Sequence, residues 1–519
     1  MKMKLNLFQC RMCQPFLLMT LLAAAAMLLG TAWMSDDAFI TMRTIDNFVN
    51  GYGLRYNVAE RVQAFTHPLW LMVLTPFYAL TREALLTPML ISVALSLGAF
   101  WLLISRISKQ LEYGCLLVLA AMASRAISQF STSGLENPLT FLLLALLVLQ
   151  LYRTERKDWV AAGIVGLLLL NRLDLAVLVG PVAAYLLFRA HGWERAKVVV
   201  AAAFPVLVWI IFSLVYYGAP FPNTAYAKLG TGFDTGTLFL RGLDYGWDFL
   251  LHDPLLALLI GMAVVVALRS RDRMTALLGA GIALYVVYTM AIGGDFMSSR
   301  FFAAPGFLAL CLLARGDAPQ WLMKRSKAIG LISVAVLGVL LFSRITEQQN
   351  MIVPDNGISN ERRTYYTDNG LLPVLRAWVA TGSEPVHPWG LQGRLFKVMA
   401  QARRKAVVSS SIGMFSYYGG PTVHNIDRLA LTEPFLARLP AIPGARVGHY
   451  QRQVPPGYVE TALNAAPTTD IEELRPLLND ITLATRAPLF TDGRGGAIWR
   501  LLSGNYSWIY KADLYGAGK

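Results

Sequence analysis

Residues 66–83 read THPLWLMVLTPFYALTRE, and this stretch decides how the chain is oriented in a membrane. Its apolar run, 68–80, begins at Pro68 and contains Pro76. A helix that spans a bilayer needs about 20 mostly apolar residues, so this run is too short to cross with ease. We expect it to lie along the outer interface as a juxtamembrane helix. Every later loop then falls on a defined side of the membrane.

Eleven further apolar runs lie in the first 343 residues, and we interpret each as a membrane span. They are 15–34, 84–105, 114–130, 138–152, 159–170, 175–189, 197–217, 254–269, 274–292, 302–315 and 328–343. The first run follows basic residues, resembling a signal peptide, but Ser35, Asp36 and Asp37 come directly after it without a convincing cleavage site. We therefore expect an uncleaved first helix with a cytoplasmic N-terminus.

The charge distribution supports this topology. The segments placed inside (1–14, 106–113, 153–158, 189–197, 269–273, 315–327) hold 18 Lys and Arg in 55 residues, and the outside segments of the same region hold 8 in 105. Such an excess on the cytoplasmic side is typical of membrane proteins. If 68–80 crossed, the basic loops would face outward. The net charge of +14 is therefore mainly a topology signal, and it requires no nucleic-acid partner.

Composition narrows the class of protein in the same direction. Of the 519 residues, 55% are hydrophobic and 15% are charged. A disordered chain has the opposite balance, and an ordinary soluble enzyme has about a quarter of its residues charged. The fold class is therefore an α-helical polytopic membrane protein with a lipid bilayer as its partner.

The character of the chain changes after residue 343. Apolar runs become short, and Lys405–Ser411 (KAVVSSS) predicts a short buried strand. Residues 371–380 and 472–478 predict helices. We expect two domains: a transmembrane domain over 1–343 and a mixed α/β domain over 344–519. Eleven spans from a cytoplasmic start place the second domain outside the cytoplasm.

Unusual polar residues collect on the outer side of this topology. Asp36 and Asp37 follow the first span, where two adjacent carboxylates suit a general base or a hard-metal ligand. A cap on a following helix over 38–49 is the alternative role. Glu136 lies in a tight turn between two spans. It could bind an acceptor hydroxyl or a metal, or it could be a solvated turn carboxylate.

Charges also stand between short apolar runs. Arg172 and Asp174 lie between the apolar runs 159–170 and 175–189, at a membrane depth where a charged side chain is energetically costly. Charges at this depth indicate a polar cavity, or the two residues could form a structural ion pair. Asp295 and Arg300 follow a Gly-Gly turn. They could pair with each other, or they could meet a sugar and a phosphate separately.

Two further residues complete the set. Lys228 ends the segment YGAPFPNTAYAK (217–228), where it could pair with a lipid phosphate or remain a surface lysine at the interface. His67 begins the juxtamembrane run. Polar clusters gathered on one face predict a cavity that opens outward. A charged, membrane-borne reactant such as a lipid-linked phosphate fits it, with basic residues on the phosphate and a carboxylate activating a hydroxyl.

Several of these motifs resemble those of a known superfamily. They are SDDAFITMR (35–43), NGYGL (50–54), THPLW (66–70), SGLE (133–136), PFPNTAYAK (220–228), GDFM (294–297), IDRLALT (426–432) and RVGHY (446–450). In this order they resemble the GT-C glycosyltransferases. Within that superfamily they are most similar to the bacterial terminal arabinofuranosyltransferases and their pilin-modifying relatives.

The resemblance implies a polyprenyl-phosphate-linked sugar donor and an extracytoplasmic glycan or protein acceptor. It also implies an inner-membrane location, with the C-terminal domain in the periplasm. It makes Asp36 the first candidate for the catalytic carboxylate and Asp37 the second, with a divalent cation (Mg, Mn or Ca) as a possible partner of both. His67 holds the position of a phosphate-binding basic residue.

Other residues receive roles as candidates. Lys228, Arg300, Arg172 and Asp295 are candidates for binding the donor phosphate or sugar, and Glu136 and Asp174 for the acceptor or the cavity. Two rival functions stay open. One is a transporter or flippase of lipid-linked sugars, although we find no inverted repeat. The other is a mannosyl- or aminosugar transferase of the same superfamily.

Overall fold

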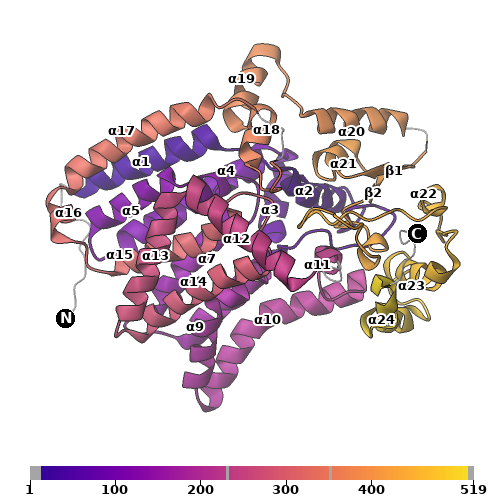
Figure 1. Cartoon of the computed structure of the whole chain (residues 1–519), viewed down its shortest axis with the longest axis horizontal. Coiled ribbons are helices and arrows are strands. Elements are labelled where there is room, and N and C mark those ends of the chain that lie inside the picture. Colours follow the sequence, from indigo (N-terminus) through magenta and orange to yellow (C-terminus); the bar gives the residue numbers. More distant parts are fainter. Residues whose placement is uncertain (1–12, 229–232, 350–353, 401–402, 512–519) are drawn as a thin grey trace. The chain divides into compact units, whose positions relative to one another are not determined.

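The computed structural model describes residues 13–228, 233–349, 354–400 and 403–511 (Figure 1). Within these ranges the chain is mostly helical, with a single two-stranded sheet. The basic residues before the first apolar run, on which the predicted cytoplasmic start partly rests, lie outside the described residues.

The chain divides into two compact units that are discontinuous in sequence. The first comprises Met1–Ser35, Leu85–Val206 and Phe239–Pro385, and the second comprises Asp36–Ala84, Leu207–Leu238 and Val386–Lys519. These boundaries differ from a division at residue 343, because residues up to Pro385 cluster with the first unit. The predicted division concerned sides of a membrane, and it stays a prediction.

The first unit is built from helices, most of which are apolar. They are α1 (Cys13–Thr31), α4 (Leu86–Leu102) continued by the π-helix η1 (Leu103–Ile107), α5 (Leu111–Ala123), α6 (Arg125–Phe130), α7 (Asn137–Leu151), α8 (Asp158–Asn171), α9 (Leu175–Arg189), α13 (Pro254–Arg269), α14 (Arg273–Ala291), η2 (Arg300–Phe302), α15 (Ala303–Arg315), α16 (Gln320–Lys324), α17 (Ser326–Ile345), α18 (Glu361–Asn369) and α19 (Leu371–Thr381). Two long helices, α10 (Gly192–Tyr217) and α12 (Thr235–His252), have residues in both units.

Each of the eleven predicted spans contains a helix. Among the described residues, five helices are long and apolar enough to cross a membrane: α1, α4 with η1, α10, α14 and α17. The pair α12 and α13, bent by 109°, brings the number to six if it forms one span. Helices α5, α7, α8 and α9 are apolar but shorter. The chain is therefore a membrane protein by length and composition, while the count of eleven stays a prediction.

Close packing of helices in the first unit depends on glycine at particular positions. A Cβ atom on Gly281 of α14 would lie 1.9 Å from the carbonyl oxygen of Leu178 in α9. Only a residue without a side chain allows this approach. As a result, the next turn of α14 brings Tyr285 against the start of α9, where its hydroxyl donates to Asp174 at 2.9 Å.

A break divides the predicted span 114–130 into α5 and α6. Ser124 adopts an extended conformation between them, and its hydroxyl accepts the amide of Ile127, which caps α6. Asp253 accepts from the Ser124 hydroxyl at 2.6 Å and from the Ala126 amide at 2.8 Å. The polar groups exposed by the break are thus satisfied inside the helical unit.

The second unit combines shorter helices with a small parallel sheet. Its elements are α2 (Asp36–Val49), α3 (Pro68–Thr81), α11 (Asn223–Lys228), α20 (Pro388–Met399), β1 (Lys405–Ser409), α21 (Met414–Gly419), β2 (Val423–Asp427), η3 (Leu436–Arg438), α22 (Tyr458–Thr461), η4 (Glu472–Leu474), α23 (Arg475–Thr485), α24 (Arg494–Leu502) and η5 (Ser507–Lys511). The apolar run 68–80 forms α3, which begins at Pro68 and ends at Arg82 in the left-handed conformation.

Strand β1 pairs in parallel with β2, Lys405 opposite Val423 and Ser409 opposite Asp427, with α21 in the crossover. The predicted strand within 405–411 is confirmed, but its predicted burial is wrong. Lys405 and Val408 are exposed, because the apolar clusters of the second unit form around Val423 and Ile426 of β2 and leave β1 at their margin. Strand β2 is buried throughout. The helices predicted at 371–380 and 472–478 are confirmed as α19 and as η4 with α23.

Arg43 of α2 fixes this helix to the C-terminal part of the second unit. Its buried guanidinium donates to the carbonyl oxygens of Tyr56 and Val423, each at 2.7 Å, and to that of Ser416. It also lies 4.8 Å from the ring centroid of Tyr56. One side chain therefore joins α2 to the loop that follows it, to α21 and to β2.

Replacing Arg43 with Met would remove these donors and keep most of the side-chain volume. Each buried carbonyl that loses its partner costs about 1–3 kcal/mol, so we expect the free energy of unfolding to fall by about 3 kcal/mol or more. Thermal unfolding of the detergent-solubilised protein, followed by tryptophan fluorescence, measures the effect.

Arg82→Met is the matched control. Arg82 is exposed and donates to Asn50 at 2.9 Å, so its loss changes stability by less than about 1 kcal/mol. Equal melting temperatures for the two variants would contradict the assigned role of Arg43.

Candidate functional site

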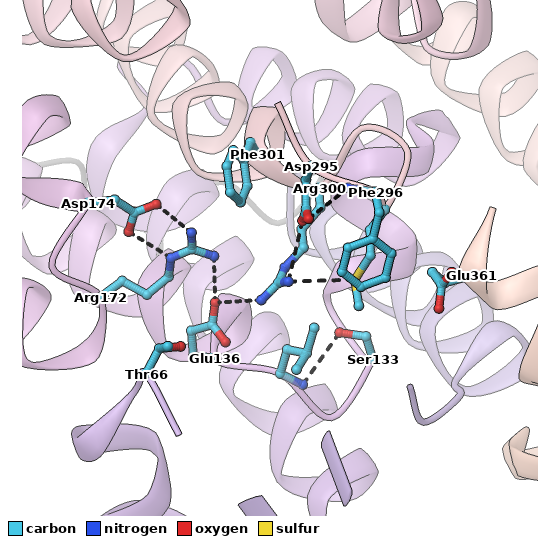
Figure 2. A network of polar contacts seen from close by, with 12 residues as sticks. Thr66, Ser133, Glu136, Arg172, Asp174, Asp295, Phe296, Arg300, Phe301 and Glu361 are labelled. Carbon is cyan, nitrogen blue, oxygen red and sulfur yellow. Dashed lines mark hydrogen bonds and ion pairs between the residues drawn. The ribbon is translucent and has the colours of Figure 1, made fainter. Parts of the chain in front are cut away.

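Five of the predicted site residues converge in the first unit (Figure 2). Glu136 comes from the turn before α7, and Arg172 and Asp174 come from the short link between α8 and α9. Asp295 and Arg300 come from the turn between α14 and η2. The three turns therefore bring together charges that are separated by up to 164 positions in the sequence.

Arg172 lies at the centre of this charged network. Its Nη1 donates to Oε1 of Glu136 at 2.8 Å, and its Nε donates to Oδ1 of Asp174 at 2.8 Å. Its Nη2 donates to the second oxygen of Asp174, which makes that contact bidentate. The guanidinium also lies 5.1 Å from the ring centroid of Phe301. The predicted Arg172–Asp174 ion pair is thus present, and it extends to Glu136.

Arg300 approaches the same carboxylate from the other side. Its Nη2 is 3.4 Å from Oε1 of Glu136, and its Nη1 is 3.4 Å from Oδ2 of Asp295. Asp295 also accepts the amide of Phe296 at 2.8 Å. Glu136 has 0% of its surface exposed, so the interpretation of Glu136 as a solvated turn carboxylate is wrong. The packing of the first unit therefore buries a turn that looks exposed in the sequence.

The charges in this network nearly balance. Three carboxylates face two guanidinium groups, which leaves a formal charge of −1 when all are ionised. Buried pairs of this kind are geometrically demanding, and removing one member leaves an uncompensated charge. Arg172 and Arg300 are therefore engaged by carboxylates, and a phosphate that bound either would compete with Glu136.

The other predicted residues belong to the second unit, and Asp36 has the most constrained surroundings. It is the first residue of α2, 9% exposed. Its Oδ2 accepts the amide of Gly413 at 3.0 Å, and its Oδ1 accepts the amide of Met414 at 2.7 Å. These bonds connect the carboxylate to the C-terminal segment. A Cβ on Gly413 would lie 1.8 Å from the carbonyl oxygen of Asp36, so glycine is required there.

The surroundings of Asp36 also change its acidity. The pKa of its carboxyl is raised to about 7. Burial is the main cause, the two amide bonds partly offset it, and the neighbouring charge of Asp37 adds to the rise. A carboxyl group with a pKa near neutrality can both take up and release a proton under physiological conditions. Asp37 itself is half-buried.

Asp427, at the end of β2, is a buried carboxylate to which the sequence assigned no role. It accepts the amides of Leu429, Leu431 and Thr432 at 2.8, 2.6 and 3.0 Å. Burial nevertheless raises its pKa to about 6. Asp427 belongs to the motif IDRLALT (426–432), which resembles a motif of the arabinofuranosyltransferases. Membership of this motif is the sequence signal that points to Asp427.

A hydrogen bond links the motif IDRLALT (426–432) to the motif PFPNTAYAK (220–228). Asn223 donates to the carbonyl oxygen of Ala430 at 2.8 Å, and Ala430 has a φ of 60°, which is unusual for a residue with a side chain. Two of the motifs that carry the resemblance therefore hold each other in place. Lys228, at the end of α11, is exposed.

His67 is buried at the start of α3. Its Nε2 is 2.8 Å from the hydroxyl of Thr41 in α2, and its Nδ1 is 3.4 Å from that of Thr66. The ring therefore holds the first turn of α3 against α2.

A further group of potential metal ligands was not found from the sequence. Glu60, His424 and Glu433 place one ligand atom each within 4.8 Å of one another. These residues are scattered along the chain without a recognisable spacing, so only the fold brings them together. A cation at Asp36 and Asp37 stays a prediction.

No family model matches the chain. Terminal β-(1→2)-arabinofuranosyltransferase of Corynebacterium glutamicum is 30% identical over 325 residues, which cover 54% of this chain and 47% of that protein. The protein of the same name from Mycobacterium tuberculosis is 26% identical over 518 residues, which cover 82% of this chain and 81% of that protein. The chain thus spans about half the length of the first relative.

Among solved structures, the apo oligosaccharyltransferase of Archaeoglobus fulgidus superposes with a TM-score of 0.50 at 10% identity, over 95% of this chain and 72% of that one. The fold of the chain therefore resembles the fold of this oligosaccharyltransferase. The sequence relatives confirm the predicted resemblance to terminal arabinofuranosyltransferases. These likenesses support a glycosyltransferase.

The charged network of the first unit yields a test of stability. Arg172→Met leaves Glu136 and Asp174 buried without its guanidinium, and breaking a buried pair costs about 3–5 kcal/mol. Lys109→Met is the control, since its pair with Asp317 at 3.1 Å is on the surface and such pairs contribute about 0–1 kcal/mol. Thermal unfolding in detergent should separate the variants clearly. A melting temperature of Arg172→Met equal to that of Lys109→Met would rule out a structural role for the network.

Proposed function

We propose that the chain is a multi-pass glycosyltransferase of the cytoplasmic (inner) membrane that transfers arabinofuranose from a polyprenyl-phosphate donor to a glycan or protein outside the cytoplasm. Its N-terminus would be cytoplasmic and its C-terminal domain periplasmic. The observation that carries the proposal is Asp36, a buried carboxylate directly after the first apolar helix, held by two backbone amides, with its pKa raised to about 7. The likeness to two arabinofuranosyltransferases supports the choice of sugar.

In the proposed reaction, a hydroxyl oxygen of the acceptor attacks the anomeric carbon of the donor sugar. The bond between that carbon and the phosphate oxygen breaks, and polyprenyl phosphate leaves with the electron pair. The proton of the hydroxyl passes to Asp36. A base with a pKa near the working pH is suited to this transfer, because it is ionised before the step and accepts the proton during it.

The leaving phosphate needs a positive partner. Lys228 is exposed, while Arg172 and Arg300 contact carboxylates. We therefore favour Lys228 for the phosphate over Arg172 and Arg300, with His67 as a further candidate for contact with the phosphate.

The charged residues of the first unit are the remaining candidates for binding the sugar and the acceptor. Asp295 would bind the sugar together with Arg300, and Glu136 and Asp174 would shape the cavity for the acceptor.

A divalent cation is the alternative use of the two adjacent carboxylates. Both oxygens of Asp36 already accept amide hydrogens, and Asp36 with Asp37 supplies too few ligands for a complete oxygen shell. The base role is therefore assigned to Asp36 itself, and Asp37 acts by keeping the pKa of Asp36 high.

Transfer assays on membranes that carry the protein test the function. Labelled polyprenyl-phosphate arabinofuranose and polyprenyl-phosphate mannose are offered separately with an arabinan oligosaccharide acceptor. We expect transfer from the arabinofuranose donor, and a loss of about 10²–10⁴-fold in Asp36→Asn with unchanged protein in the membrane. Asp46→Asn, in the same helix, is the control that keeps activity. Wild-type rates in Asp36→Asn would refute the assignment, and transfer from the mannose donor alone would favour the mannosyltransferase.

The raised pKa of Asp36 predicts a pH profile. Below a pKa of about 7 the base is protonated, so kcat/KM should fall about tenfold for each unit of decreasing pH and level off above the pKa. Measurement between pH 5 and 8 gives the curve, with Asp46→Asn expected to follow the wild type. A profile that is flat over this range contradicts the role of Asp36 as base.

A further inference from the structure

A second group of buried ionisable residues lies in the second unit. Glu60 comes from the loop between α2 and α3, His424 from β2, and Glu433 from the segment that follows β2. Their exposed fractions are 1%, 4% and 0%. Residues of these types are seldom fully buried without a partner that offsets the lost hydration.

Ligand atoms converge at the centre of this group. Oε1 of Glu60 is 3.9 Å from Nε2 of His424, which is too long for a hydrogen bond. Among the described residues, that oxygen, both ring nitrogens of His424 and Oε2 of Glu433 are buried without a hydrogen-bond partner. One ligand atom from each residue lies within 4.8 Å of the other two. Tetrahedral coordination at about 2.0–2.1 Å places ligands about 3.3 Å apart, so binding of one ion would draw the three ligand atoms together by up to about 1.5 Å.

The opposite oxygens of both carboxylates are held by other side chains. Oε2 of Glu60 accepts from Arg486 at 3.2 Å, and Oε1 of Glu433 accepts from the hydroxyl of Tyr458 at 2.7 Å. Each carboxylate is thus oriented by one oxygen and directs the other toward the shared centre. Outer partners of this kind are typical around metal ligands, because they fix the direction of the coordinating lone pair.

The charge balance calls for a cation. Two carboxylates face one guanidinium, that of Arg486, so the ionised group carries a formal charge of −1. Among the described residues, neither ring nitrogen of His424 has a hydrogen-bond partner, so a nitrogen lone pair of the imidazole is available to a cation.

We propose that Glu60, His424 and Glu433 bind a divalent transition-metal ion of the zinc class, separate from the candidate catalytic carboxylates. One imidazole nitrogen and two carboxylate oxygens suit zinc better than magnesium or calcium, which prefer oxygen ligands alone. The ion joins the loop after α2 to β2 and the segment that follows it. Its role is to stabilise this unit, and it does not depend on the proposed transfer reaction.

Metal content and thermal stability test the proposal on the full-length chain purified in detergent with a tag that lacks histidine. After equilibration with zinc and desalting, we expect about one zinc ion per chain by mass spectrometry. We also expect zinc to raise the melting temperature and EDTA to reverse the rise. Cobalt in place of zinc should give visible d–d absorption from a site with a nitrogen ligand.

Two variants and a control make the test decisive. Glu433→Gln keeps the size of the side chain and the oxygen that accepts from Tyr458. It should fold, yet lose the bound zinc and the zinc-induced rise in melting temperature. His424→Leu should lose the cobalt absorption. His191→Ala, a change at an exposed histidine, should retain both properties.

The opposite results would overturn the proposal. A wild-type chain that retains no zinc, and whose melting temperature does not respond to zinc, would show that the three residues bind no metal ion. Equal zinc binding in the wild type and Glu433→Gln would place the metal elsewhere.

Discussion

The buried guanidinium of Arg43 imposes the constraint on which the second unit depends. A cation removed from water must have its donors satisfied, and here carbonyl oxygens from three separate segments satisfy them. Helix α2 can adopt its position only when the loop after it, α21 and β2 are all in place. The same arrangement brings the amides of Gly413 and Met414 to Asp36, two turns earlier on that helix.

The two units stabilise buried carboxylates in different ways. In the first, Glu136, Asp174 and Asp295 face the guanidinium groups of Arg172 and Arg300. In the second, Asp36 receives neutral amide dipoles, which lower its pKa too little to offset burial. A neighbouring cation favours the ionised form of a carboxylate, whereas the amide bonds to Asp36 leave its pKa at about 7. This contrast is the physical reason for assigning acid–base chemistry to Asp36.

Much of the local structure could be predicted from the sequence. Apolar runs identified helices because a helix satisfies its own backbone hydrogen bonds within the segment. Arg172 with Asp174 and Asp295 with Arg300 were recognised because each pair lies within one turn. The donors to Asp36 could not be predicted, because backbone amides carry no residue signature and lie 377 and 378 positions away. Tyr285 was hidden in an apolar run, and the burial of Glu136 depended on packing between distant helices.

The separation between Asp36 and its two amide donors has a consequence for biosynthesis. When the first apolar helix leaves the ribosome, the segment that holds its neighbouring carboxylate has yet to be translated. Asp36 therefore enters the membrane surface as an ordinary acid and acquires its altered acidity only after residues 413 and 414 arrive. The nascent chain consequently lacks these two amide bonds to Asp36 until residues 413 and 414 have been translated, and a product truncated before residue 413 would never form them.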